Sequence, residues 1–439
     1  MERAIRGKFL LPVKSTAYLR FGVWPKNSMT ENPNTASERA ARYEEVYKRV
    51  FDIARNENFA GYDPFDGLES RIFKAIPILN HFALIRMAWL QSIKRLPINL
   101  RRMLGVPRGI NPKGVALFAL AEAARIRDDL RGTDNLSYLL ELLDRLAILE
   151  VDGSGSRLRS FGYNFDWQSR AFYAPKLTPT IVPTAFAAKA YLDGYELLGS
   201  AKFLEAADEI CRFILNRLRR PFETATEICF SYTPNDNSRI LNASLLAGEV
   251  LARTGELVGR KDYLETALKT ARFVVGLQSP EGSWPYGTRL RHKWVDNFHT
   301  AFMISSLLAL YDKCSSLLER DESEKIFSSI DRGTNFWIDN FFLASAAPKY
   351  FHNRTNPIDI HSAAAAIVTL ADLAETRDDA IRLACRIADW TLENMYYGGR
   401  FFYQKNALIT VRIEFIRWGQ AWMAFALSRL AEVIHKKAK

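Results

Sequence analysis

A pattern of apolar and polar positions recurs six times along the chain, about every sixty residues. Each time, a polar or aromatic loop leads into an apolar helix rich in small residues, and a more charged amphipathic helix follows. Six equivalent positions, 57 to 70 residues apart, align the repeats: Gly114, Thr184, Asn242, His299, His361 and Gln420. One such unit cannot bury its apolar face alone, so the units must stack or close into a ring.

Composition assigns the helices of each pair to two different rings. The first helix is rich in Ala, Gly and Ser, which lets neighbouring backbones approach closely, whereas the second has one charged face. The predicted inner helices are 112–127, 179–198, 238–253, 297–312, 358–374 and 415–434. Five outer partners follow them, and the sixth must come from the N-terminal helices. We therefore expect an all-α (α/α)6 toroid, a six-hairpin barrel closed by N-terminal helices.

The same pattern divides the chain into two parts. Residues 1–60 are expected to be an irregular N-terminal segment and a first helix packing on the toroid, and residues 61–439 a single catalytic-type domain. The loops that lead into the inner helices are long, whereas the turns that leave them are short. Insertions on one face of such an array mark the binding face, so we expect the site where the inner helices begin.

These long loops concentrate aromatic, Arg, His, Asn and Asp side chains. Aromatic faces beside hydrogen-bonding groups suit a sugar, and the excess of Arg and His over carboxylates favours an acidic oligo- or polysaccharide, uronate-containing or lipid-phosphate-linked. The N-terminal dipoles of the inner helices add to that preference. The predicted substrate-binding residues are Tyr163, Asn164, Trp167, Arg170, Trp284, Arg291, His292, His352, Arg354, Asp359, Glu414, Arg417 and Trp418.

Two reaction types fit this inventory. A uronate epimerase or lyase needs a neutralised carboxylate, a base and an acid, which Asn297, His299, Tyr286, His361 and Arg417 can supply. A glycoside hydrolase needs two facing carboxylates, for which Asp166 and Asp296 are candidates, together with Asp359 and Glu414. The basic loops favour proton abstraction, while a glycoside hydrolase and a non-catalytic glycan-binding assembly factor remain alternatives.

The net charge of +11 is concentrated in one part of the sequence. No acidic residue occurs between Glu69 and Glu122, whereas residues 71–113 hold nine Lys and Arg among aromatic and aliphatic residues. This pattern predicts peripheral contact with an anionic membrane, and the alternative is an outer helix that packs on the ring. No nucleic-acid recognition motif accompanies the charge, so nucleic acid is not an expected partner.

Cysteine usage and hydropathy give the compartment. The four cysteines are scattered without metal-ligand spacing, which predicts reduced thiols, no metal site and a cytoplasmic protein. The basic segment 71–113 would hold this protein at the inner face of the membrane. No apolar run is long enough to span a bilayer. No cofactor motif is present, and no cofactor is expected.

Four segments carry a resemblance to a known family: GYDPFDGLESR, PINLRRMLGVPRGINPKG, FGYNFDWQSR and VDNFHT. They resemble prokaryotic proteins found with surface-polysaccharide biosynthesis genes, over nearly the whole chain from about Gly61. The resemblance implies a six-hairpin glycosidase-like fold and a role in making or modifying a polysaccharide, but it carries over no catalytic residues. The segment QSPEGSW is similar to the repeat of terpene cyclases, whose acidic DxDD and DDxxD motifs are missing, so that class is excluded.

Overall fold

The structure is a computed structural model that describes residues 33–128, 136–151, 158–170, 172–377 and 379–438. These described residues form one compact unit, which includes the first helix. The irregular segment expected before this helix lies outside the described residues.

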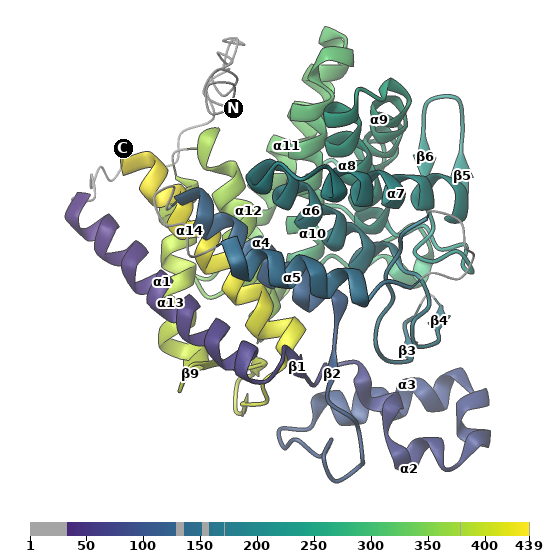
Figure 1. Cartoon of the computed structure of the whole chain (residues 1–439), viewed down its shortest axis with the longest axis vertical. Coiled ribbons are helices and arrows are strands. Elements are labelled where there is room, and N and C mark those ends of the chain that lie inside the picture. Colours follow the sequence, from purple (N-terminus) through teal and green to yellow (C-terminus); the bar gives the residue numbers. More distant parts are fainter. Residues whose placement is uncertain (1–32, 129–135, 152–157, 171, 378, 439) are drawn as a thin grey trace. The chain divides into compact units, whose positions relative to one another are not determined.

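Twelve helices of the described residues form two concentric rings, as the repeat pattern predicts (Figure 1). The inner helices are α4 (Pro112–Asp128), α6 (Ile181–Leu198), α8 (Leu241–Val258), α10 (Asn297–Lys313), α12 (Ile360–Asp372) and α14 (Trp422–Ala438). The outer helices are α5 (Leu136–Ile148), α7 (Ala201–Arg217), α9 (Lys261–Val275), α11 (Arg320–Phe341), α13 (Ala380–Met395) and α1 (Pro33–Asn56). The predicted all-α (α/α)6 toroid is confirmed.

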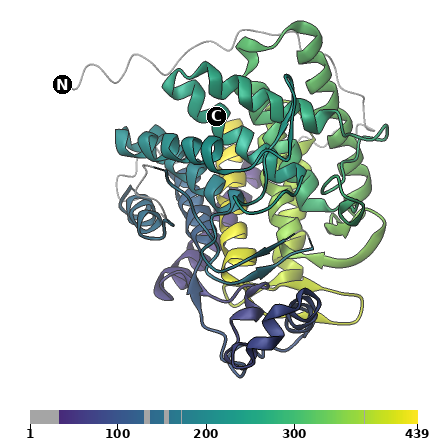
Figure 2. The ribbon, with the colours of Figure 1, turned by 90° about the vertical axis from the view of Figure 1, so that its right-hand side faces the viewer.

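Contacts between helices show that the inner ring is closed. Each inner helix packs on the next, and α14 packs on α4, which completes the circle. Each of α4 to α12 packs on the outer helix that follows it, whereas α14 packs on α1 from the start of the chain. Figure 1 shows α14 between α1 and α4, and Figure 2 shows it surrounded by the other helices. The N-terminal helix therefore closes the barrel, as expected.

Small residues set the spacing of the inner ring. In α12, Ala363, Ala364, Ala365 and Ala366 are all buried, so this helix has no solvent-facing side at these positions. Where α8 meets α9, a Cβ at Gly248 would lie 2.1 Å from the Thr270 Oγ1 atom. Close approach of this kind requires the small-residue composition that marks the inner helices in the sequence.

A small lobe, residues 66–106, is inserted between the first helix and the first repeat (Figures 1 and 2). The sequence predicts one helix over 68–95, interrupted or kinked at Pro77. The structure breaks it into η1 (Asp66–Glu69), α2 (Arg71–Lys74), η2 (Pro77–His81) and α3 (Ala83–Arg95). Leu68, Phe73 and Leu90 form a core of the lobe that is separate from the main core.

Short strands lie in the loops at the ends of the helices. Pairs are formed by β1 (Ala60–Gly61) with β2 (Gly109–Ile110), β3 (Trp167–Gln168) with β4 (Tyr173–Ala174), β5 (Phe222–Glu223) with β6 (Ile228–Cys229), and β9 (Tyr396–Tyr397) with β10 (Arg400–Phe401). The largest sheet has the order β12 (Thr410–Val411), β11 (Gln404–Lys405), β8 (Arg354–Asp359), β7 (Lys349–Phe351), all antiparallel. In this sheet Gln404 pairs with Asp359, which directly precedes α12.

The cysteines are free and buried in the described part of the chain. Burial raises the pKa of the Cys211 and Cys229 thiols to about 12, so neither is a ready nucleophile. None of the helices that the structure describes is both long and apolar enough to cross a membrane.

Candidate active site

A cavity of about 600 Å³ opens at the end of the barrel where the inner helices begin. The last inner helix is preceded by a π-helical segment, η7 (Ile416–Ala421). The second residue of each inner element lines the cavity: Lys113, Val182, Asn242, Phe298, His361 and Arg417. The six repeats therefore contribute to one common site from the same position, which is the convergence that their periodicity predicts.

Many of the residues predicted for the site do line this cavity, and many of its lining residues are aromatic. The nine predicted residues that line it are Tyr163, Trp167, Arg170, Tyr286, His299, Arg354, His361, Arg417 and Trp418. Other lining residues come from the loops, from the sheet at the rim and from α3 of the lobe. Whether the nine act in binding or catalysis stays a prediction.

The start of α10 holds an Asp–Trp–His group. Asp296 is the N-cap of α10 and accepts hydrogen bonds from the His299 backbone N–H (3.1 Å) and from Trp294 Nε1 (2.9 Å). Its second oxygen lies 2.7 Å from His299 Nδ1. Since a carboxylate oxygen can only accept, Nδ1 carries the proton, and the free ring nitrogen, Nε2, is left for a substrate.

The start of α12 holds a second group of the same residue types. Asp359 is the N-cap of α12, where it accepts from the His361 backbone N–H (2.9 Å), Trp418 Nε1 (2.9 Å) and Gln404 Nε2 (2.6 Å). The Trp418 indole stacks on the His361 imidazole, with centroids 4.1 Å apart. Here the imidazole Nδ1 faces the Trp418 carbonyl oxygen at 3.3 Å, so Nε2 is again the free ring nitrogen.

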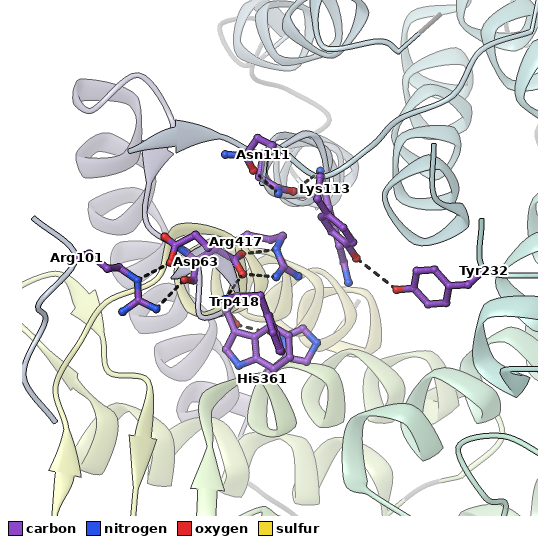
Figure 3. Close-up of polar contacts among 12 residues, drawn as sticks. Asp63, Arg101, Asn111, Lys113, Tyr232, His361, Arg417 and Trp418 are labelled. Carbon is purple, nitrogen blue, oxygen red and sulfur yellow. Dashed lines mark hydrogen bonds and ion pairs between the residues drawn. The ribbon is translucent and has the colours of Figure 1, made fainter. Parts of the chain in front are cut away.

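The π-helical turn places Arg417 and Trp418 in the cavity wall. The Gln420 N–H donates to the Phe415 carbonyl, five residues back, which widens the turn. Arg417 makes two hydrogen bonds to the buried Asp63 carboxylate, at 2.6 and 2.8 Å. Arg101 in turn donates to the Asp63 carbonyl oxygen, so the segment before the lobe is held against η7 (Figure 3).

The two imidazoles flank the same aromatic side chains. The Phe298 ring centroid is 4.2 Å from that of His299 and 4.8 Å from that of His361. Burial, reinforced by the positive charges of Lys113 and Arg417, lowers the pKa of His361 well below its ordinary value. His361 is therefore neutral at neutral pH, and an anionic ligand that offsets the charge of Arg417 would increase its basicity.

Positive charge dominates the cavity. Six basic residues line it, and no aspartate or glutamate of the described residues does: Lys94, Arg95, Lys113, Arg170, Arg354 and Arg417. Of these, Arg417 is paired with Asp63, whereas no carboxylate of the described part of the chain forms an ion pair with the other five. Such a surface favours an anionic ligand, which would supply the missing counter-charges.

Lys113 is a lining residue that the sequence reasoning missed (Figure 3). It was counted in the basic segment 71–113, but its side chain is buried. Its Nζ atom lies 4.4 Å from the ring centroid of Phe186, 5.0 Å from Trp422 and 5.5 Å from Phe302. Burial, with the nearby charge of Arg417, lowers the pKa of this amine well below its ordinary value.

Two polar atoms in the wall have no hydrogen-bond partner among the described residues: Asn242 Oδ1 and Tyr403 Oη. Tyr163 and Tyr232 contact each other through their hydroxyl groups at 3.5 Å (Figure 3). An unpaired buried polar atom is costly, and both of the unpaired atoms belong to residues that line the cavity. Asn242 is the position that aligns its repeat with the other five, but nothing in the sequence distinguishes it from a packing residue.

Several predicted catalytic residues do not line the cavity. Asn297 is buried, and its amide is occupied by Trp337 Nε1 and by the Lys349 carbonyl, both at 2.9 Å. The Asp166 carboxylate accepts from the Lys176 N–H, outside the cavity wall. Asp296 lies behind His299 and positions it. The structure therefore gives no support to Asn297 as a catalyst, or to Asp166 and Asp296 as a hydrolytic pair.

Other predicted binding residues are used to hold the loops. Trp284 is buried and donates to the Val274 carbonyl. Asn164 accepts from Asn111, Glu414 pairs with Arg400, and Asp359 is the cap described above. His292 is buried beside Tyr286 and Trp294, and this burial lowers its pKa. His352 packs against Phe336 and Phe341. Arg291 is exposed and does not line the cavity.

Comparison with solved structures places this architecture among known folds. A cellobiose 2-epimerase from Bacillus thermoamylovorans aligns with a TM-score of 0.58 and 12% identity, over 75% of this chain and 88% of its own. An unsaturated glucuronyl hydrolase specific for heparin aligns with a TM-score of 0.56 and 12% identity, over 92% and 99%. An α-mannanase of glycoside hydrolase family 76 from Bacteroides thetaiotaomicron aligns with a TM-score of 0.53 and 12% identity, over 73% and 85%.

At this level of identity the likeness shows the fold alone. The chain shares with these proteins the (α/α)6 toroid that its sequence predicts. No protein-family model matches the sequence, and no curated protein matches it. Membership of the surface-polysaccharide biosynthesis family therefore stays a prediction.

Proposed function

We propose that this protein is a carbohydrate-active enzyme that abstracts a proton from an acidic sugar, as a uronate epimerase or lyase. One observation carries the proposal. The imidazoles of His299 and His361 both line a cavity whose described lining residues include six basic side chains and no carboxylate. The structural neighbours support it by class, since epimerases and an unsaturated glucuronyl hydrolase share this fold.

The chemistry follows from the groups in the cavity. The Nε2 atom of the neutral His361 takes the proton from the carbon next to the sugar carboxylate, and the electron pair moves onto the carboxylate oxygens. Lys94 and the lining arginines Arg95, Arg170 and Arg354 offset the negative charge that develops there. Return of a proton from His299, whose imidazolium form can pair with Asp296, gives the epimer. If the electron pair instead expels an oxygen substituent on the next carbon, the product is an unsaturated uronate.

A retaining or inverting hydrolase is the weaker alternative. Both mechanisms need two carboxyl groups across the scissile bond. The nearest acidic groups, Asp63, Asp296 and Asp359, are each engaged by Arg417, His299 or Trp418 rather than directed at the cavity. Hydrolysis through a carboxylate pair therefore has no support in the described residues.

The test is isotope exchange on uronate-containing oligosaccharides in deuterium oxide. We expect deuterium at one sugar carbon, detected by mass spectrometry, and a loss of about a hundredfold or more in the rate for His361→Asn and for His299→Asn. Exchange with an inverted centre identifies an epimerase, and ultraviolet absorbance of an unsaturated product identifies a lyase. His81→Asn is the matched control, because His81 is an exposed histidine outside the cavity.

Other results would contradict the proposal in distinct ways. New reducing ends without deuterium exchange would indicate a hydrolase. Tight binding of acidic oligosaccharides with no exchange, no cleavage and no effect of either histidine variant would indicate the non-catalytic binding factor.

A further inference from the structure

The lobe formed by residues 66–106 exposes an unusual number of large apolar side chains. Leu84 is 85% exposed, Met103 79%, Ile98 68% and Ile78 65%. Further exposed members of the same lobe are Ile72, Ile76, Phe82, Ile85 and Leu96. Nine of the seventeen large apolar side chains exposed on the described residues belong to this lobe, and such a concentration is typical of an interaction surface.

The inner side of the lobe explains why these residues are not needed for folding. Leu68, Phe73 and Leu90 already form its small core. Arg86 and Arg101 point inward, with Arg86 donating to Gln168 Oε1 and Arg101 donating to Asp66 Oδ1. The exposed apolar residues are therefore additional to the packing that holds the lobe together.

The exposed charged side chains of the lobe itself are all basic, because its two acidic residues, Asp66 and Glu69, are buried. No acidic residue occurs between Glu69 and Glu122, and Arg71, Arg95 and Arg102 are exposed on the lobe. Apolar side chains interspersed with Lys and Arg are the composition of elements that lie in the interface of an anionic bilayer. A second copy of the chain fits less well, because a two-fold contact through the lobe would bring one basic surface against another.

The lobe is also a wall of the cavity. Met87, Gln91, Lys94 and Arg95, all from α3, line the cavity, while Leu84 and Ile85 on the same helix are exposed. One helix therefore joins the apolar surface to the candidate active site. A protein seated on a bilayer through the lobe would hold the cavity within reach of the headgroup region.

We propose that the lobe docks on an anionic membrane surface, and that the enzyme acts there on an acidic glycan carried by a membrane lipid. The docking stands on the exposed side chains and their charge, whereas the choice of substrate rests on the proposed function. The full-length chain binds by shallow insertion of the apolar residues, with the arginines against lipid headgroups.

Vesicle flotation of the full-length protein tests the docking without any assay of catalysis. We expect binding to phosphatidylcholine vesicles that contain phosphatidylglycerol, little binding to phosphatidylcholine alone, and loss of binding as salt rises. The double variant Ile78→Glu, Leu84→Glu should weaken binding about tenfold or more. Ile148→Glu, at a residue 83% exposed on the outer helix α5, is the matched control and should bind as the wild type does.

A second arm separates the docking from the substrate. The double variant should lose turnover of an acidic oligosaccharide that is coupled to a vesicle lipid. It should keep wild-type turnover of the same oligosaccharide free in solution. Absence of vesicle binding at low salt would overturn the docking, as would a dimer that the double variant disrupts. Docking with equal turnover of free and lipid-coupled substrate by both proteins would overturn the substrate class while leaving proton abstraction intact.

Discussion

Lys113 lies among the rings of Phe186, Phe302 and Trp422, with no carboxylate of the described residues against its amine. Its pKa is lowered in the folded protein, mainly by burial, whereas in the unfolded chain it keeps its ordinary value. At neutral pH folding therefore has to desolvate this ammonium group or release its proton, and either one costs free energy. A residue kept at such a cost in a cavity is typical of a functional site.

Replacing Lys113 by Met should consequently stabilise the protein while it reduces turnover. We expect the free energy of unfolding at about pH 7 to rise by about 1–3 kcal/mol, because an amine that must give up its proton on folding is removed. The gain should shrink as the pH approaches the ordinary pKa of lysine, where the unfolded chain also loses the proton. Denaturant unfolding across this pH range measures it, and Lys113→Arg serves as the control that keeps the cost. A loss of stability in Lys113→Met would contradict this account.

Lys94 gives the cavity a predicted pH dependence. Burial lowers its pKa to about 8, against the opposing charges of Asp359 and Asp63, and its Nζ atom lies 4.0 Å from the Phe65 ring centroid. The charged form binds an acidic sugar below this value and is lost as the pH rises through it. The dissociation constant for an acidic oligosaccharide should therefore rise roughly tenfold between about pH 7 and about pH 9.

Isothermal titration calorimetry measures this change directly. Lys94→Met should bind weakly at both pH values and should show a flat profile. A wild-type affinity that is constant over this range would exclude Lys94 as an anion-binding group.

At the scale of elements, the inner helices depend on small side chains at particular positions. Gly248 of α8 faces Thr270 of α9, and a methyl group at Gly248 would lie 2.1 Å from the Thr270 Oγ1 atom and 3.2 Å from its Cβ atom. Thr270 is itself buried and donates to the Ala267 carbonyl. The gain in helix propensity from Gly to Ala is therefore outweighed by overpacking.

Gly248→Ala should lower the free energy of unfolding by about 1–3 kcal/mol. The double variant with Thr270→Ala should recover part of this loss, because the clashing hydroxyl and methyl groups are gone. The control is Ala252→Ser, a small substitution at another buried position of α8, which tests whether any change in this helix is harmful. Gly199→Ala would not serve, because Gly199 has φ +64°, where alanine is strained. Chemical denaturation measures the free energy of unfolding of the wild type, the two single variants and the double variant. An unchanged free energy for Gly248→Ala would show that α8 and α9 move apart without cost.

At the scale of the whole molecule, α1 joins the last repeat to the first. The Tyr43 hydroxyl donates to Asp389 on α13, at 2.9 Å, and the Tyr47 hydroxyl donates to Glu122 on α4. Tyr43, Tyr47, Val50 and Phe51 are buried, and α1 packs along α14. A ring closed in this way has no terminal repeat with an uncovered face, whereas the end repeats of an open array need capping.

A chain that begins at residue 57 should therefore fail to fold into a stable monomer. Four buried large side chains contribute about 1.5–3 kcal/mol each, which together is comparable to the total stability of about 5–15 kcal/mol of a typical domain. A chain that begins at Pro33 is the control, since it keeps every contact among the described residues. Circular dichroism melts and size-exclusion chromatography compare them, and a cooperative, near-wild-type melt of the shorter chain would show that α1 is dispensable.

The candidate site is where sequence reasoning succeeded only in part. The loops were recognised by their composition, and His299, His361, Tyr163 and Arg417 do line one cavity. Side-chain direction was not accessible in the same way. Asn297 and His299 are two residues apart on one helix, yet the first is bound to Trp337 inside the wall and only the second lines the cavity.

Local periodicity by itself determined the helices of the two rings, their inner and outer places and the closure of the ring, because a repeat that recurs six times leaves each apolar face with only one kind of partner. It did not determine the lobe, where the helix predicted over 68–95 is broken into four short elements. Tertiary structure alone decided which polar groups line the cavity and which hold its wall. Lys113 and Asp359 show why, since an amine and a carboxylate have the same sequence signal whether they face a ligand or a buried partner. Burial and charge at a site come from segments far apart in the chain, and only the folded arrangement brings them together.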